Sequence, residues 1–167
     1  MTPRVRLWER FDAMHIRYRW ASPADYSELG EVMFRAVRYG PSLYSDAQRA
    51  AWVAEPRQGE EWNARLAKQD IALAQWDENI TGFMSLEAEG YIDFVYILAE
   101  HQGTGLFRKL FGMIHAHART QGATQLWTHA SLMARPAFAA MGFDIAEKEN
   151  IALNGQNFER FKMHMVL

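Results

Sequence analysis

At 167 residues, with 49% hydrophobic and 13% aromatic residues, the chain suits one domain with a substantial core, and a disordered protein is excluded. The net charge of −2 and the pI of about 6.3 provide no basic field, so nucleic acid is excluded as a partner. Cysteine is absent, which excludes disulfides, thiolate nucleophiles and thiolate metal sites.

Two further features concern location and the start of the chain. No apolar run approaches the roughly 20 residues of a membrane-spanning helix, so we expect a cytoplasmic protein with no membrane partner. Residues 1–13 are rich in charge and contain no apolar stretch, unlike a secretory signal. We expect residues 1–14 to be an N-terminal extension, which is an ordered element, a frayed tail or an overlong start preceding Met14, and residues 15–167 to be the folded domain.

The first part of the chain predicts one strand followed by helices. Ile16 to Trp20 alternates apolar and charged residues, the pattern of a strand with one solvated face. Ser22-Pro23-Ala24-Asp25 supplies an N-cap, a proline at the first helical position and an acidic first turn, and the helix that starts there ends at Gly40-Pro41. Ser45 caps a second short helix, and Glu60 to Lys68 has the spacing of a third.

Three strands separated only by turns follow these helices. They are Ile71–Trp76, Ile80–Leu86 and Tyr91–Ile97. Such short connections give an antiparallel meander, because parallel neighbours need a long crossover. A dinucleotide-binding βαβ unit is therefore disfavoured.

The segment Gln102-Gly103-Thr104-Gly105 joins the last of these strands to a helix that runs to about Thr120. The two glycines allow the backbone N–H groups of the loop to turn toward one point at the positive end of the helix, which suits a phosphate. Thr124–Ala130 is the next strand. Since a helix connects it to Tyr91–Ile97, those two strands should be parallel, and they diverge if a ligand enters between them.

The end of the chain predicts a short helix at Ala134–Met141 and a final hairpin of Phe143–Leu153 and Asn157–Val166. The order of elements is that of a single α+β domain. Among the histidines, His115 and His117 cannot share a helix face, and no other spacing predicts a metal site.

The glycine loop resembles the central motif of the GNAT superfamily of acyl-CoA-dependent N-acyltransferases. That motif reads Gln or Arg, two residues, Gly, one residue, then Gly or Ala, and the segment from Gln102 fits it except at Phe107. A second family motif fits at Ala134 and Gly142-Phe143 but departs at Ser131 and Phe138. The stretches Tyr44–Trp52 and Ala130–Pro136 also resemble a group of bacterial members.

The resemblance implies a single-domain α+β fold for residues 15–167. Its mixed sheet would have six to seven strands, with an antiparallel meander, a splayed parallel pair and helices on both faces. It also implies acetyl-CoA as co-substrate, no metal, and, from family habit, a homodimer through the final hairpin. The residues implied to bind the coenzyme are Val95, Tyr96 and Ile97 for the pantetheine arm, Gln102, Gly103, Thr104, Gly105, Leu106, Phe107 and Arg108 for the phosphates, and Ser131, Ala134 and Phe138 beside the thiol.

Transfer to an amine needs a base, and two residues are candidates. Asp93 is an unusual carboxylate within a strand, and alternation places it on one face with Val95. A hydrogen-bonded structural aspartate is the alternative. His129 is the second candidate, because an imidazole exchanges protons near neutral pH, although a structural histidine would look the same in the sequence.

The leaving thiolate and the acceptor raise two further expectations. In the family a tyrosine at the position of Phe138 usually protonates the thiolate, so Tyr96, water or no acid at all takes that role here. An aromatic and arginine grouping of Arg38, Tyr39, Tyr44 and Trp52 is the predicted acceptor site, although such residues are also common in cores.

These observations predict an N-acetyltransferase that acts on a small-molecule or amino-acid-like amine. The alternative from another class is a non-catalytic acyl-CoA-binding or sensing domain, which the departures at Phe107 and Phe138 favour. A Rossmann nucleotide enzyme is disfavoured, because the loop lacks the third glycine of its fingerprint.

Overall fold

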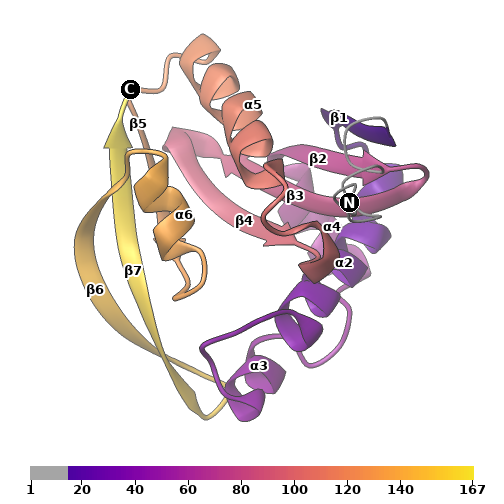
Figure 1. Ribbon diagram of the computed structural model, residues 1–167, viewed down its shortest axis with the longest axis vertical. Helices are drawn as coiled ribbons and strands as arrows, with labels where there is room; N and C mark the ends of the chain where they lie inside the picture. Colours follow the sequence, from indigo (N-terminus) through magenta and orange to yellow (C-terminus); the bar gives the residue numbers. More distant parts are fainter. Residues whose placement is uncertain (1–14) are drawn as a thin grey trace, which may run out of the picture.

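The computed structural model describes residues 15–167, so the expectation for residues 1–14 lies outside the described residues. Its centre is a seven-stranded sheet in the order β1-β2-β3-β4-β5-β7-β6 (Figure 1). The strands are β1 (Ile16–Trp20), β2 (Asp70–Trp76), β3 (Asn79–Glu87), β4 (Tyr91–Ile97), β5 (Gln125–Ala130), β6 (Asp144–Leu153) and β7 (Gln156–Val166). The helices are η1 (Pro23–Asp25), α2 (Tyr26–Tyr39), α3 (Asp46–Trp52), α4 (Glu60–Ala67), η2 (Ala88–Gly90), η3 (Ala99–His101), α5 (Leu106–Thr120) and α6 (Arg135–Ala140).

Strand pairing confirms the predicted topology. Neighbouring strands are antiparallel except β4 and β5, which are parallel. Of the two strands of the final hairpin, β7 pairs with β5, and β6 forms the edge of the sheet. The reason is burial, since β7 contributes Phe158, Phe161 and Met163 to the core, whereas most of β6 is exposed.

Helices cover both faces of the sheet, as predicted. On one face α5 buries Leu110 and Ile114, and α6 adds Phe138 to the same core. On the other face α2 buries Met33 and α4 buries Leu66 in a second core. The apolar residues of each helix recur at helical spacing and form one stripe along its surface. Burial of this stripe against the sheet fixes the orientation of the helix.

The parallel strands β4 and β5 separate soon after they begin. They pair only at Tyr91 with Trp127 and at Ile92 with Thr128. From residue 93 onward the edge of β4 that faces β5 has no strand partner, and Figure 1 shows β4 and β7 running in different directions. The predicted splayed pair is therefore present, and it leaves backbone groups of β4 unpaired.

A β-bulge interrupts the pairing of β4 with β3 between Met84 and Leu86. Met84 and Leu86 are two positions apart on β3, whereas their partners Val95 and Ile92 are three positions apart on β4. The extra residue therefore lies on β4. The Phe94 N–H donates to the Ser85 hydroxyl oxygen, at 2.9 Å, instead of to a backbone carbonyl of β3. An insertion of this kind bends a strand and redirects its side chains.

The bulge overturns one expectation based on strand alternation. Val95 packs against the core beneath α5, whereas Phe94 and Tyr96 both belong to the core beneath α2. The Asp93 carboxylate is on the α2 side, where it binds Arg65 of α4. The prediction that Asp93 and Val95 share a face was wrong, because the inserted residue reverses the alternation between them.

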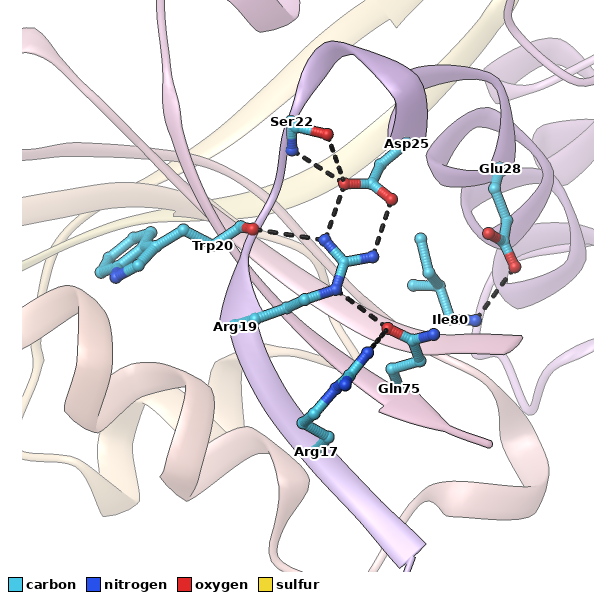
Figure 2. Close-up of polar contacts among 8 residues, drawn as sticks. All are labelled: Arg17, Arg19, Trp20, Ser22, Asp25, Glu28, Gln75 and Ile80. Carbon is cyan, nitrogen blue, oxygen red and sulfur yellow. Dashed lines mark hydrogen bonds and ion pairs between the residues drawn. The ribbon is translucent and has the colours of Figure 1, made fainter. Parts of the chain in front are cut away.

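A polar network fixes the junction of β1 with the first helices (Figure 2). Both terminal nitrogens of Arg19 donate to the Asp25 carboxylate at 2.8 Å, and Arg19 Nε donates to Gln75 on β2 at 2.9 Å. The Ser22 N–H also donates to Asp25, at 2.8 Å, which closes the predicted turn at the helix start. The Arg19 guanidinium is the main reason that the pKa of Asp25 lies below its ordinary value of 3.8.

The tip of the β6–β7 hairpin is bound to α3. Asn154 Nδ2 donates to the Ala51 carbonyl at 2.8 Å, and Gln48 Nε2 donates to the Asn157 carbonyl at 2.7 Å. Ser45 caps α3, as predicted, by accepting the Gln48 N–H. This contact joins the first helices to the last hairpin at the end of the molecule where β4 and β5 are apart.

Residues 15–167 contain neither a membrane-spanning helix nor a cluster of metal-ligating side chains. No helix in that range is both long and apolar enough to cross a membrane. No group of three or more metal-ligating side chains lies close together in the same part of the chain.

Candidate functional site

A cleft of about 1080 Å³ lies where β4 and β5 separate. Its walls come from β4, the loop at residues 101–108, β5 and α6, and, across from them, from α2 and the segment after α3. Among the residues predicted to bind acyl-CoA, the structure places twelve on this wall: Val95, Tyr96, Ile97, Gln102, Gly103, Gly105, Leu106, Phe107, Arg108, Ser131, Ala134 and Phe138. Thr104 is not on the wall, since its hydroxyl turns back to donate to the His101 carbonyl at 2.5 Å.

The glycine loop adopts a conformation that requires glycine. The φ angles of Gly103 and Gly105 are +74° and +89°. A Cβ atom at either residue would meet no protein atom within 4 Å, so the backbone angle and not crowding selects glycine. The space beside both residues is open for a ligand.

The loop leads into α5 with a cluster of available donors. Among the described residues, no backbone N–H from Gly103 to Arg108 has a protein acceptor, and the first bond of the helix runs from the Lys109 N–H to the Gly105 carbonyl, at 3.2 Å. The first turn contains Arg108 and Lys109 and no acidic residue, which is the unfavourable sign for the helix dipole. Clustered donors and positive charge at the start of a 15-residue helix are the features of an anion site.

The unpaired edge of β4 connects the glycine loop to the middle of the cleft. Val95, Tyr96 and Ile97 line the cleft along this edge. Gln102 ties the end of the strand to the loop, because its side-chain amide donates to the Ile97 carbonyl at 3.0 Å. An open strand edge of this kind can pair with the amides of an extended ligand.

Asp93 lies on the cleft wall, but its carboxylate is already engaged. Arg65 Nη2 and Nε donate to its two oxygens at 2.9 and 3.1 Å, and Gln69 Nε2 donates at 2.7 Å. Its side chain is only 8% exposed. The Arg65 guanidinium also lies over the Phe94 ring, at 4.5 Å from its centre. These three donors occupy both carboxylate oxygens, so the Asp93 side chain is already used in holding Arg65 and Gln69.

In contrast to the Asp93 carboxylate, the His129 ring is held at one nitrogen and keeps the other available. Its Nδ1 is 2.8 Å from Glu149 Oε1 on β6, which leaves the Nε2 atom of the same ring for another partner. The ring lies against Tyr91, with centroids 5.8 Å apart, and lines the cleft. A carboxylate on one ring nitrogen fixes the orientation and tautomer of an imidazole, which prepares the other nitrogen to accept a proton.

Two tyrosines of β4 line the cleft as neutral phenols. Burial raises the pKa of Tyr91 to about 12. Burial also raises the pKa of Tyr96, whose hydroxyl interacts with the Trp52 side chain. Both hydroxyls therefore remain protonated at neutral pH and can act as hydrogen-bond donors.

Comparison with known families agrees with this geometry. The family model for the acetyltransferase (GNAT) domain matches residues 41–166. The chain belongs to the GNAT acetyltransferase family. The match covers β4, the glycine loop, α5 and the final hairpin, which are the elements that form the cleft.

Individual relatives agree with the family match. The chain is 28% identical over 152 residues to the uncharacterized N-acetyltransferase YafP of Escherichia coli, covering 89% of this chain and 95% of the relative. A GCN5-related N-acetyltransferase structure from Rhodopseudomonas palustris has a TM-score of 0.83 at 23% identity, covering 92% of this chain and 96% of that one. The PaiA N-acetyltransferase of Thermoplasma acidophilum, in complex with coenzyme A, has a TM-score of 0.71 at 16% identity, covering 92% of this chain and 100% of that one. The two structures show that the GNAT fold is shared.

The two departures from the GNAT motifs are in contact. The rings of Phe107 and Phe138 have centroids 5.1 Å apart in an edge-to-face arrangement, and Phe143 adds a third ring 5.0 Å from Phe138. Phe138 has no exposed surface. The two residues therefore form one apolar unit beside the cleft, so a change at one position affects the packing of the other.

The predicted acceptor residues are not all in the cleft. Trp52 lines it, whereas Arg38, Tyr39 and Tyr44 do not. Arg38 donates to the Val53 and Ala54 carbonyls at 3.2 and 3.0 Å. Tyr39 is 73% exposed. Tyr44 is buried, where its hydroxyl donates to the Glu159 carbonyl at 2.5 Å and accepts the Leu132 N–H.

Four charged residues on or behind the wall of the GNAT cleft were not predicted from the sequence. Arg57, Arg65 and Arg160 line the cleft, and Glu149 lies behind His129. Arg57 directly follows a proline in the break between two helices, which gave no functional signal. The other three come from α4, β6 and β7, and only tertiary structure brings them to β4 and β5.

Proposed function

We propose that this GNAT domain transfers the acetyl group of acetyl-CoA to the primary amine of a small-molecule or amino-acid-like acceptor, by direct attack in a ternary complex. One observation carries the proposal. A single cleft connects the free N–H groups of the glycine loop, the open edge of β4 and the imidazole of His129. An acyl donor with a phosphate end can therefore be held so that its acyl end lies near a base.

The chain offers separate groups for each part of the donor. The amides from Gly103 to Phe107 would hold the pyrophosphate, and Arg108 would contact an outer phosphate. The edge of β4 from Val95 to Ile97 would pair with the pantetheine amides, beside Ser131 and Ala134. Acetyl-CoA supplies an activated acyl group, and the work left to the protein is to orient it and to manage protons.

Two groups act on the reacting centre in this proposal. A backbone N–H near Val95 or Tyr96 donates to the acyl oxygen, and one such donor is worth roughly 3 kcal/mol of barrier. His129 takes the amine proton through Nε2 while Glu149 holds Nδ1. The amine nitrogen forms the new bond to the carbonyl carbon as the bond to sulfur breaks. Holding the two reactants together supplies much of the remaining acceleration.

The leaving thiolate needs a different donor from the one usual in the family. Phe138 has no proton to give, whereas the Tyr96 phenol remains protonated. We assign to Tyr96 the donation of a hydrogen bond or a proton to the thiolate. Asp93 is assigned a positioning role, because it holds Arg65 against the bulged part of β4.

The base assignment is tested by two matched variants. His129→Gln keeps a polar side chain but cannot serve as a base, so kcat/KM should fall roughly 100-fold or more. Asp93→Asn should alter KM and stability while leaving the shape of the pH profile unchanged. The measurement is the pH dependence of thiol release from acetyl-CoA with an amine acceptor. A pH profile that changes in Asp93→Asn and not in His129→Gln would reverse the two roles.

The alternative is an acyl-CoA-binding domain without catalysis, which the Phe107–Phe138 pair favours because neither ring can donate a proton. Thermal-shift titration with acetyl-CoA, CoA and NAD tests the common part, because a ligand that binds only the folded state raises its apparent stability. Stabilisation by acetyl-CoA together with thiol release in an amine screen supports the enzyme. Stabilisation without any acceptor-dependent release supports the binding domain.

A further inference from the structure

The charged side chains on the cleft wall are mostly positive. They are Arg57, Arg65, Arg108 and Arg160 against a single carboxylate, Asp93. Arg108 lies at the glycine loop, whereas the other three arginines come from the segment after α3, from α4 and from β7. A binding surface with this balance attracts an anion and repels a polyamine.

Two of these arginines already have partners. Arg65 is bound to both oxygens of Asp93 and lies over the Phe94 ring. Arg160 is 3.6 Å from Glu149, whose nearer partner is His129 at 2.8 Å. Their charges are therefore wholly or partly balanced within the protein.

Arg57 differs from both. Arg57 has no hydrogen bond or ion pair with any residue from 15 to 167, and the residue as a whole is partly buried. Trp52 and Tyr96 line the same cleft, and the Arg57 charge acts on the Tyr96 hydroxyl. A guanidinium on the cleft wall that has no counter-charge from the protein is available to pair with a ligand anion.

The backbone at Arg57 is held firmly against α2. A Cβ atom added to Gly30 would lie 1.9 Å from the Arg57 carbonyl oxygen, so the segment and the helix are in direct backbone contact. Arg38 holds the start of the segment through the Val53 and Ala54 carbonyls. Arg57 is thus presented from a fixed backbone, which favours a defined ligand geometry.

We propose that Arg57 binds a carboxylate of the acceptor, so that the preferred acceptors are amino acids: amines that also carry a carboxylate. This inference rests on the proposed function and deepens it. A guanidinium can hold a carboxylate through two parallel hydrogen bonds. The positive charge also favours the neutral form of the nearby amine, which is the form that attacks the acyl carbon.

The first test measures binding without turnover. Purified protein is titrated with proteinogenic α-amino acids and with the corresponding α-amides, which keep the side chain and the amine but lack the carboxylate. At least one amino acid should raise the melting temperature of the wild type while its amide does not. Arg57→Gln should abolish that shift. Arg35→Gln, which removes a positive charge outside the cleft wall, is the matched control and should keep it.

The second test measures acetylation of the same pairs. For the best amino acid, Arg57→Gln should lower kcat/KM roughly 30-fold or more, while Arg35→Gln stays near the wild type. A retained thermal shift with acetyl-CoA shows that each variant is folded. Amides that react as well as the acids, or no reaction with any amino acid, would overturn the carboxylate inference. Absence of stabilisation by acetyl-CoA in the wild type would instead overturn the proposed function.

Discussion

The Asp25 carboxylate accepts hydrogen bonds from the Arg19 guanidinium and from the Ser22 N–H at the start of the first helices (Figure 2). Its side chain is only 11% exposed, and that of Arg19 is 31% exposed. Asp25→Asn should therefore lower the free energy of unfolding by about 2 kcal/mol at neutral pH, because the Arg19 charge would lose its partner. Urea denaturation measures this change.

The same pair predicts a dependence on pH. Since the folded pKa of Asp25 lies below 3.8, the unfolded chain takes up the proton first as the pH falls. The stabilisation is complete above about pH 4 and is lost at lower pH. Asp46→Asn is a control, since that side chain is 94% exposed in its pair with Arg49 and should leave stability unchanged. Equal acid sensitivity in Asp25→Asn and the wild type would contradict the prediction.

Asp93 and His129 show which features of the site could not be predicted from the sequence. Asp93 stood out because a carboxylate within a strand is unusual, and it does lie on the cleft wall. Its partner Arg65 is 28 residues away in the sequence, on another element, so the neutralising ion pair could not be foreseen. The orientation of the His129 imidazole could not be predicted either, because it depends on Glu149, which is also distant in the sequence.

At the level of elements, the turn into β4 sets where the two parallel strands meet. Gly90 has a φ angle of +76°, and an added Cβ would lie 2.0 Å from the Gln125 carbonyl oxygen at the start of β5. Gly90→Ala should therefore destabilise the protein by about 3 kcal/mol, through both strain and displacement of one strand.

A second glycine separates those two effects. Gly122 has a φ angle of +79°, but an added Cβ there would meet nothing within 4 Å. Gly122→Ala should cost only the backbone strain, about 1 kcal/mol. Thermal denaturation of both variants gives the comparison. If Gly90→Ala cost no more than Gly122→Ala, close approach would not determine the β4–β5 junction.

Most elements were predictable because their signals are local. Ser45 caps a helix and the Gly40-Pro41 pair ends one, and the structure places both as expected. The bulge in β4 was not predictable, because it depends on Ser85 of the neighbouring strand accepting the Phe94 N–H. The pairing of β7 with β5 also depends on which hairpin strand can bury more apolar surface.

Across the whole molecule, the sheet is joined at its centre by only a short parallel pairing, and Tyr91 packs there on Trp127 with centroids 4.3 Å apart. Burial raises the pKa of Tyr91 from 10.0 to about 12. Below pH 10 both states keep the proton, so the stabilisation is complete. Between pH 10 and about 12 the unfolded state loses its proton first, and stability falls.

This alkaline loss is measured by urea denaturation at about pH 9 and pH 11. The contribution of Tyr91 to the loss should be about 1 kcal/mol. Tyr91→Phe should remove that contribution. Tyr39→Phe, at a side chain that is 73% exposed, should behave as the wild type. An unchanged pH dependence in Tyr91→Phe would show that this buried tyrosine does not link alkaline pH to unfolding.

The sequence by itself determined the order and type of the elements, the antiparallel meander, the parallel pair and the glycine loop before α5. These follow from periodicity, capping residues and connection lengths, which act between residues close in the chain. Only the tertiary structure decided on which side of the sheet Asp93 lies, the contact of Phe107 with Phe138, the carboxylate behind His129 and the place of Arg57 on the cleft wall. Those features depend on side chains brought together from distant elements, and burial, not local propensity, fixes their partners.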